Sequence, residues 1–237
     1  MSRIDDIHTF YEHLSILEQK VKGKRLLSNC NGRMGWPNKG VYFFFKNGEF
    51  RRSGNGMRVV RVGTHAVSAN SKTTLWDRLR MHRGNLSGEY KYGGNHRGSI
   101  FRLHVGTAII RKECFHVPTW GVGSSAKREI SELEYLIEKK VSDHICSMPF
   151  LWLEVDDCVG INSMRKYIEK NSIGLLSNYG VSDLIDPPSK NWLGNYCPND
   201  YIRRSGLWNV DHVDKSYDHN FLVTISNYID NICISRT

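Results

Sequence analysis

The sequence predicts an α+β fold, an α/β sandwich in which a small mixed sheet of about three strands is covered by helices. The chain has 237 residues, 40% of them hydrophobic, which is enough for a full buried core. Short β-type runs alternate with longer runs of helical period. Further helical runs flank this part at both ends, as N- and C-terminal elaborations. Such a mixture is typical of a sheet packed beneath helices.

The first elements are a helix and a β-hairpin. Residues 5–22 carry apolar side chains at helical spacing, on one stripe. A loop rich in Asn and Gly covers residues 28–39. Residues 41–45 and 58–63 are β-type runs, and turn signals that begin at Asn47-Gly48 separate them. The pair therefore predicts a hairpin with a long tip.

A basic helix follows the hairpin. Ser71 or Thr73 is expected to cap it, and it ends near a Gly-rich basic loop at residues 84–98. Residues 99–110 fit two structures. Their apolar positions alternate as in a strand, but they also fit a helix that Ser99 caps.

The second half contains a long helix, a strand and two more helices. Residues 125–145 have a clear helical pattern, and residues 150–155 predict a buried strand. Residues 163–177 and 218–232 are again helical. A long loop that begins near residue 186 separates them.

Composition favours a cytoplasmic protein that binds a polyanion. There are 33 Lys and Arg against 24 Asp and Glu, a formal net charge of +9, and nucleic acid is the commonest polyanionic partner. No signal peptide is expected, and no apolar run approaches the ~18 residues of a membrane span. No pair of cysteines has C-x-x-C spacing, so reduced thiols are expected at six positions: 30, 114, 146, 158, 197 and 233.

Three short motifs follow one another in the hairpin and the basic helix. They are Gly40-Val41-Tyr42, Arg61-Val62-Gly63 and Leu75-x-x-Arg78-x-x-x-His82. Their order resembles the GIY-YIG nucleases, in which two strands end in Gly-Ile-Tyr and Tyr-Ile-Gly and the next helix carries an Arg. The spacing of Arg78 and His82 is similar to the restriction-enzyme branch, whose next element is a helix, as residues 99–110 are then expected to be.

The resemblance covers residues 39–178, the expected nuclease core. Residues 1–38 would be an N-terminal helix and loop, and residues 179–237 a C-terminal elaboration. These two additions are expected to build DNA contacts or a homodimer surface. The resemblance implies a metal-dependent DNA endonuclease.

The implied catalytic residues suit phosphodiester hydrolysis. Tyr42 would take a proton from water, and Arg78 would bind two phosphate oxygens. His82 lies one turn after Arg78 and would relay a proton with Tyr42 or bind phosphate. Glu169, after the strand at residues 150–155, would bind Mg²⁺ or Mn²⁺, since Mg²⁺ suits a site with a single carboxylate.

Three further residues complete the candidate catalytic set. His65 follows the second motif, and Asn178 takes the place of the family's closing Asn. Arg61 stands where the second tyrosine of the family would be. Arg61 is interpreted in one of two ways: it binds phosphate, or it indicates that this chain is a relative of the family without nuclease activity. The alternative function is therefore a non-catalytic nucleic-acid-binding protein on the same scaffold.

Other polar residues have a less specific interpretation. Glu132, Glu134 and Glu138 are expected on a solvated helix face. The loop with Asn95, His96 and Arg97 is either a surface turn or a contact to the DNA backbone. Additional DNA contacts are expected from Arg203 and Arg204.

Overall fold

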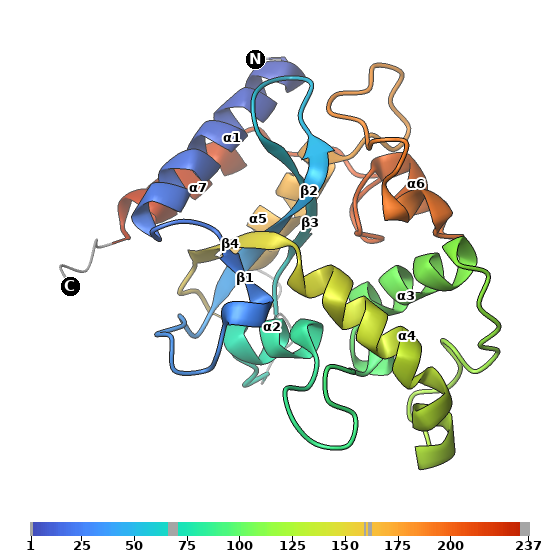
Figure 1. The fold of residues 1–237 in the computed structure, drawn as a ribbon. Coiled ribbons are helices and arrows are strands. Elements are labelled where there is room, and N and C mark those ends of the chain that lie inside the picture. The colour runs from blue at the N-terminus through green and yellow to red at the C-terminus, as the bar shows by residue number, and fades with distance from the viewer. Residues whose placement is uncertain (1, 66–70, 159, 161–162, 233–237) are drawn as a thin grey trace.

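Four strands form one sheet at the centre of the molecule (Figure 1). The structure is a computed structural model that describes residues 2–65, 71–158, 160 and 163–232. The strand order is β1-β4-β2-β3, and each neighbouring pair is antiparallel. The predicted α+β class is confirmed, with four antiparallel strands in the described sheet where the sequence suggests about three in a mixed sheet. The strands are β1 (Arg25–Leu26), β2 (Gly40–Phe50), β3 (Met57–Gly63) and β4 (Pro149–Glu154).

Alternating side chains of β2 contribute to two separate cores. Val41, Phe43 and Phe45 belong to the core on one face of the sheet, and Tyr42 and Phe44 belong to the core on the other. All five side chains are buried. Because β2 lies between β3 and β4, its backbone is paired on both sides, which fixes the direction of each side chain.

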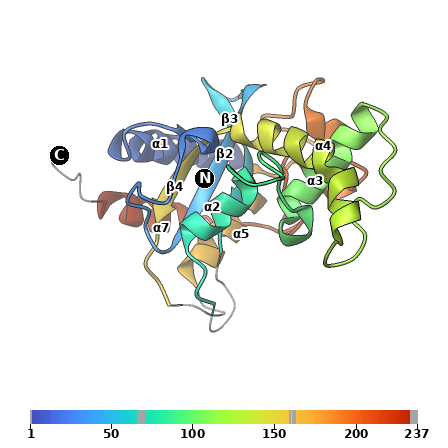
Figure 2. The same ribbon diagram turned by 60° about the horizontal axis from the view of Figure 1, so that its bottom comes forward.

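Three helices cover the face of the sheet that carries Val41. They are α1 (Arg3–Lys20), α5 (Met164–Leu176) and α7 (Phe221–Asp230), and α1 and α7 lie side by side (Figures 1 and 2). Ser2 begins α1 with a capping box to Asp5. This layer joins the two ends of the chain, so the terminal helices share one core with the central strands.

The other face carries the helices that surround Tyr42. They are α2 (Leu75–Arg83), α3 (Ile100–Lys112) and α4 (Arg128–Cys146), which Figure 2 shows mainly on the side opposite to α7. Shorter helices complete the described chain: η1 (Leu27–Asn29), η2 (His96–Gly98), η3 (Leu193–Tyr196) and α6 (Asp200–Ser205). In the described part, none of the helices is both long and apolar enough to cross a bilayer.

The structure resolves the ambiguity at residues 99–110 in favour of the helix, and Ser99 caps α3 as expected. The cap of α2 is Thr74, and not Ser71 or Thr73. The Thr74 hydroxyl accepts the Asp77 N–H, and the Asp77 carboxylate accepts from the Thr74 N–H and hydroxyl in return. The solvated-face prediction is wrong for Glu134 and Glu138. Both side chains are buried against the loop before α3.

Candidate active site

Tyr42 and His82 form a buried hydrogen-bonded pair between the sheet and α2. Tyr42 Oη lies 2.9 Å from His82 Nε2, and both side chains are 0% exposed. Tyr42 is near the start of β2, opposite Gly63 of β3. The capped α2 places Arg78 and His82 one turn apart, so both residues of the third motif face the same region. The structure thus brings the first and third motifs together.

Gly63 makes room for the Tyr42 ring. A Cβ atom at residue 63 would lie 2.3 Å from Tyr42 Oη and 2.4 Å from Tyr42 Cζ, which is far inside van der Waals contact. The backbone of residue 63 is also held in the β2–β3 ladder, so it cannot move away without disturbing the hairpin. The glycine of the second motif is therefore needed for the position of Tyr42.

We expect Gly63→Ala to displace Tyr42 and lower the rate of cleavage about 10²-fold, since a misplacement near 1 Å has effects of this size. Gly54→Ala in the hairpin tip is the matched control, because the atoms nearest to its new Cβ belong to the flexible end of Arg51. Rates are compared at equal folded fraction. A Gly63→Ala protein that cleaves as fast as the parent would show that Tyr42 does not need this position.

The other nitrogen of His82 contacts Ser99, a residue that the sequence suggested only as a helix cap. His82 Nδ1 lies 3.0 Å from Ser99 Oγ. Burial, followed by the charges of Arg78, Arg61 and Arg102, holds the pKa of His82 well below its usual range. The imidazole is therefore neutral at pH 7, with one ring nitrogen protonated.

Arg61 lies on β3 on the same side as Tyr42, and only 6% of the residue is exposed. Its Nη1 donates to the Trp208 carbonyl at 2.5 Å, and its guanidinium lies 4.8 Å from the centre of the Phe101 ring. Burial lowers the pKa of Arg61, and the neighbouring Tyr42 and Glu169 oppose this shift. Within the described residues, Arg61 Nε has no hydrogen-bond partner. Arg61 thus places a buried positive charge beside Tyr42.

Glu169 reaches the same region from α5. Its Oε1 accepts the Thr64 N–H at 3.1 Å, and Thr64 directly follows Gly63. Burial raises the pKa of Glu169 to about 7, although Arg61, the Thr64 N–H and Arg78 favour the charged form. Asp211, which the sequence interpretation does not single out, raises this pKa slightly further. Glu169 therefore lies in the field of both Arg61 and Arg78.

The half-buried Arg78 completes the group of residues around Tyr42. Its Nη1 donates to the Gly98 carbonyl at a long 3.4 Å, and its buried Nε has no hydrogen-bond partner among the described residues. Because most of its donors lack strong protein acceptors, the guanidinium can still bind an anion. Tyr42, Arg61, Arg78, His82 and Glu169 are thus coupled by hydrogen bonds or by charge.

His65 lies at the edge of this group. Its Nε2 is 3.1 Å from the Asn38 carbonyl, and its own carbonyl accepts Arg165 Nη1 at 2.6 Å. Burial lowers the pKa of His65 to about 4. Asn178 is engaged elsewhere, because both polar atoms of its side-chain amide pair with the backbone of Ile185. The contacts of Asn178 therefore do not bring its amide to Tyr42.

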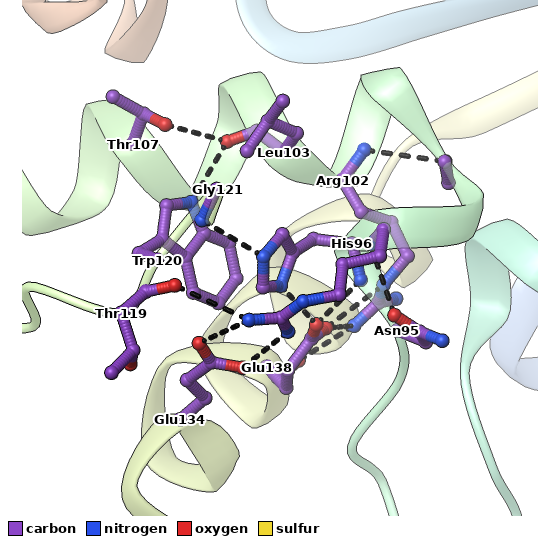
Figure 3. Close-up of polar contacts among 12 residues, drawn as sticks. Asn95, His96, Arg102, Leu103, Thr107, Thr119, Trp120, Gly121, Glu134 and Glu138 are labelled. Carbon is purple, nitrogen blue, oxygen red and sulfur yellow. Dashed lines mark hydrogen bonds and ion pairs between the residues drawn. The ribbon is translucent and has the colours of Figure 1, made fainter. Parts of the chain in front are cut away.

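The loop predicted to contact DNA contributes to a buried polar network (Figure 3). His96 stacks on Trp120, with ring centres 3.8 Å apart, and its Nδ1 lies 2.9 Å from a Glu138 oxygen. Arg97 forms a bidentate ion pair with Glu134, at 2.6 and 2.9 Å. The side chains of His96 and Arg97 thus have internal partners.

The remaining predicted DNA contacts are more exposed. Asn95 lies at the surface and caps η2 through the Arg97 N–H. Arg203 and Arg204 are on α6, where both pair with Asp200. No contact of these residues joins them to the Tyr42 group in the described structure.

Glu169 is the carboxylate among the five residues coupled around Tyr42. In the part of the chain that the structure describes, no three or more His, Cys, Asp and Glu side chains form a metal-binding group. The charges of Arg61 and Arg78 both act on Glu169, and its Oε2 has no hydrogen-bond partner among the described residues. A hard divalent cation suits such a site, because it keeps several water ligands.

Sequence comparison gives the family. A sequence model of the GIY-YIG domain matches residues 1–234, nearly the whole chain. The chain belongs to the GIY-YIG family. Members of the GIY-YIG family are nucleases, which act on nucleic acids and generally use a divalent metal ion. No curated protein and no solved structure matches significantly. The GIY-YIG match extends beyond residues 39–178 and includes residues 1–38 and most of residues 179–237.

Proposed function

We propose that this GIY-YIG protein is a divalent-metal-dependent endonuclease that hydrolyses phosphodiester bonds of DNA. The observation that supports this most strongly is the Tyr42–His82 hydrogen bond beside two guanidinium groups and one carboxylate. A phenol, guanidinium groups and a carboxylate meet the three needs of the reaction: a proton acceptor, a clamp for phosphate and a metal ligand.

In the proposed reaction, Tyr42 acts as the general base. Its phenolate takes a proton from a water molecule, whose oxygen forms a new bond to phosphorus. The bond from phosphorus to the leaving sugar oxygen breaks, and that oxygen takes a proton from solvent. Arg78 binds the phosphoryl oxygens through its fork of N–H groups as their negative charge grows. Tyr42 then returns its proton to solvent.

Glu169 is suited to hold the metal ion. Its raised pKa indicates that the protein environment alone stabilises the carboxylate charge incompletely. A bound divalent cation would favour the ionised form, and one oxygen of Glu169 remains without a protein donor among the described residues. When bound, the ion supplies charge stabilisation at the phosphate. Mg²⁺ or Mn²⁺ fits this oxygen ligand.

Two observations support our proposals that the substrate is DNA and that the protein is restriction-enzyme-like. The net charge of +9 favours a polyanion. The Arg78-x-x-x-His82 spacing, with His82 bonded to Tyr42, agrees with the resemblance to that branch. We further propose residues 39–178 as the catalytic core. Residues 1–38 and 179–237 would then extend the DNA-contacting or dimer surface.

The test is cleavage of a long DNA of mixed sequence with Mg²⁺, with Mn²⁺ and with excess chelator. We expect discrete fragments with either metal and none with chelator. A uniform smear would contradict the restriction-type assignment. DNA binding without any cleavage would instead favour a non-catalytic DNA-binding protein, the function that Arg61 in place of the second tyrosine also suits. An RNA of the same sequence serves as the substrate control.

We expect Arg61→Ala to lose most cleavage, about 10²-fold or more, as when one donor to the transition state is removed. Arg61→Lys should recover little, because an ammonium lacks the planar fork. The measurement is the single-turnover rate at matched folded fraction. Arg58→Lys is the matched control, since Arg58 is also buried on β3 but pairs with Glu49. An Arg61→Lys protein with the parental rate would remove Arg61 from the site.

A further inference from the structure

The strand that carries the second motif lies at the edge of the sheet and is irregular beside Arg61. β3 is the last strand of the described sheet and pairs with β2 on one side. Arg61 is opposite Phe44 of β2. The next pair along the ladder is Val59 with Phe45, so Val60 is an extra residue in β3. Such a bulge bends a strand and re-aims the neighbouring side chains. The direction of Arg61 therefore depends on what holds β3 from its open side.

A short segment after α6 covers the open edge of β3 at this point. The Trp208 N–H donates to the Val60 carbonyl at 2.7 Å, and the Trp208 carbonyl accepts Arg61 Nη1 at 2.5 Å. Asn209, which is 5% exposed, binds the next residue of the strand through its side chain. Its Oδ1 accepts the Val62 N–H at 3.1 Å, and its Nδ2 donates to the Val62 carbonyl at 2.8 Å. Residues 208–209 thus bind three consecutive residues of β3.

The side-chain amide of Asn209 takes the place that a further strand would have at Val62. In an antiparallel edge strand, every second residue turns its N–H and its carbonyl away from the neighbouring strand. The orientation of the Asn209 amide follows from its partners, because the Val62 N–H can only donate and the Val62 carbonyl can only accept. An unpaired buried backbone group is costly, so these two hydrogen bonds stabilise the strand in this position.

Trp208 fixes the segment in the core, so the segment can hold β3 in place. Trp208 is 0% exposed, and the centre of its ring lies 5.3 Å from that of Trp192 and 6.3 Å from that of Phe101. Phe101 is also the ring beside the Arg61 guanidinium. The backbone that carries Asn209 and the side chain of Arg61 therefore pack against the same buried group of aromatic residues.

We propose that Asn209 is a positioning residue of the active site, whose amide fixes the backbone at Val62 and thereby the direction of Arg61 toward the substrate phosphate. This inference rests on the proposed nuclease function. Val62 is the middle residue of the second motif, and Gly63, which makes room for Tyr42, follows it directly. The segment after residue 178 then contributes to the site itself, because one of its residues completes the edge of the strand that carries Arg61.

Amide hydrogen exchange tests the attachment of Asn209 without DNA or metal. The reference is the Val59 N–H of the same strand, which bonds to Tyr11 Oη in the core. We expect exchange of the Val62 N–H, relative to that of Val59, to become about tenfold faster in Asn209→Ala, because one buried hydrogen bond is lost. An unchanged ratio of the two exchange rates in the variant would overturn the proposal, whether or not the protein cleaves DNA.

Single-turnover kinetics test the role of Asn209 in cleavage. At matched folded fraction, we expect Asn209→Ala to slow cleavage of bound DNA about tenfold and to leave the affinity for DNA unchanged, because a small displacement of the phosphate-binding group slows the reaction. Asn209→Gln keeps the amide but places it one methylene farther from the backbone. It should also be slow, and it serves if the alanine variant does not fold.

Asn171→Asp is the matched control for the loss of a buried amide. The Asn171 side chain is also buried and bonds to backbone groups of Tyr167 and Asp218, away from β3. It should lower stability and leave the rate unchanged at matched folded fraction. Parental rates in both Asn209 variants would refute the positioning role.

The decisive comparison combines the substitutions of Asn209 and Arg61. If Asn209 acts through Arg61, the double variant Asn209→Ala with Arg61→Ala should be about as slow as Arg61→Ala alone. Two losses that multiply in the double variant would show that Asn209 does not act through Arg61. A parent that cleaves no DNA would refute the proposed function and the role of Asn209 in cleavage, while the exchange measurement still decides whether Asn209 holds Val62.

Discussion

Glu169→Gln is expected to abolish metal-dependent cleavage and to leave DNA binding nearly unchanged. The substitution keeps the shape of the side chain but removes the charge that would hold the metal ion. Glu169 Oε1 keeps its contact to the Thr64 N–H through the amide oxygen, so the local structure is preserved. Cleavage and binding are measured on the same samples, the second by fluorescence anisotropy of a labelled duplex. Glu132→Gln, on the exposed face of α4, is the control for a lost negative charge.

Glu169→Gln should also change the stability of the folded protein, which can be measured whether or not the protein cleaves DNA. The pKa of Glu169 is about 7 in the folded protein and 4.5 without the protein environment, so the folded state binds the proton more tightly. The stability that this proton contributes is present below pH 4.5 and is lost as the pH rises through 7. Without metal, Glu169→Gln should therefore have a higher melting temperature than the parent at pH 8, and this difference should shrink toward pH 5.

Added Mg²⁺ should raise the melting temperature of the parent but not that of Glu169→Gln. Full activity of the variant, or an equal Mg²⁺ shift in both proteins, would exclude Glu169 as the metal ligand.

Tyr42→Phe is expected to slow cleavage by at least ~10²-fold with little change in DNA affinity, because a general base acts mainly in the transition state. The ring of the variant still fills the space against Gly63. Loss of Oη also leaves His82 Nε2 without its partner, which is expected to lower stability. The rates of variant and parent are therefore compared at equal folded fraction. Single-turnover rates and binding isotherms are measured in parallel.

Tyr11→Phe is the control for the loss of a buried tyrosine hydroxyl. Tyr11 Oη accepts the Val59 N–H at 3.0 Å in the core on the other face of the sheet. Its loss should affect stability and not the rate. A Tyr42→Phe protein whose only change is weaker binding would place Tyr42 in the core and outside the chemistry.

The elements around Tyr42 could be predicted from the sequence because their signals are local. Short runs of β-type residues predict β2 and β3, and caps such as Ser99 indicate helix starts over three or four residues. The contact between Tyr42 and His82 could be predicted from the order of the hairpin and the helix, together with the family resemblance. The two-residue β1 carries too short a pattern to be recognised.

The buried charges near α4 could not be predicted, because their partners are far apart in the chain. Arg97 and Glu134 are separated by 37 residues, and Arg102 and Glu138 by 36. Alone, each of these residues looks like part of a solvated surface. Only tertiary packing shows that the four side chains compensate one another in the interior. For the same reason, the sequence shows the role of Ser99 as a cap but not its contact with His82.

In the proposed reaction, Tyr42 and His82 act as one hydrogen-bonded unit. The most direct measurement compares single-turnover rates of Tyr42→Phe, His82→Phe and the double variant, with enzyme in excess over DNA. Residues that act as a unit have non-additive effects, so the double variant should be about as slow as Tyr42→Phe alone. If the two single losses multiply in the double variant, or if His82→Phe cleaves at the parental rate, Tyr42 and His82 do not work together.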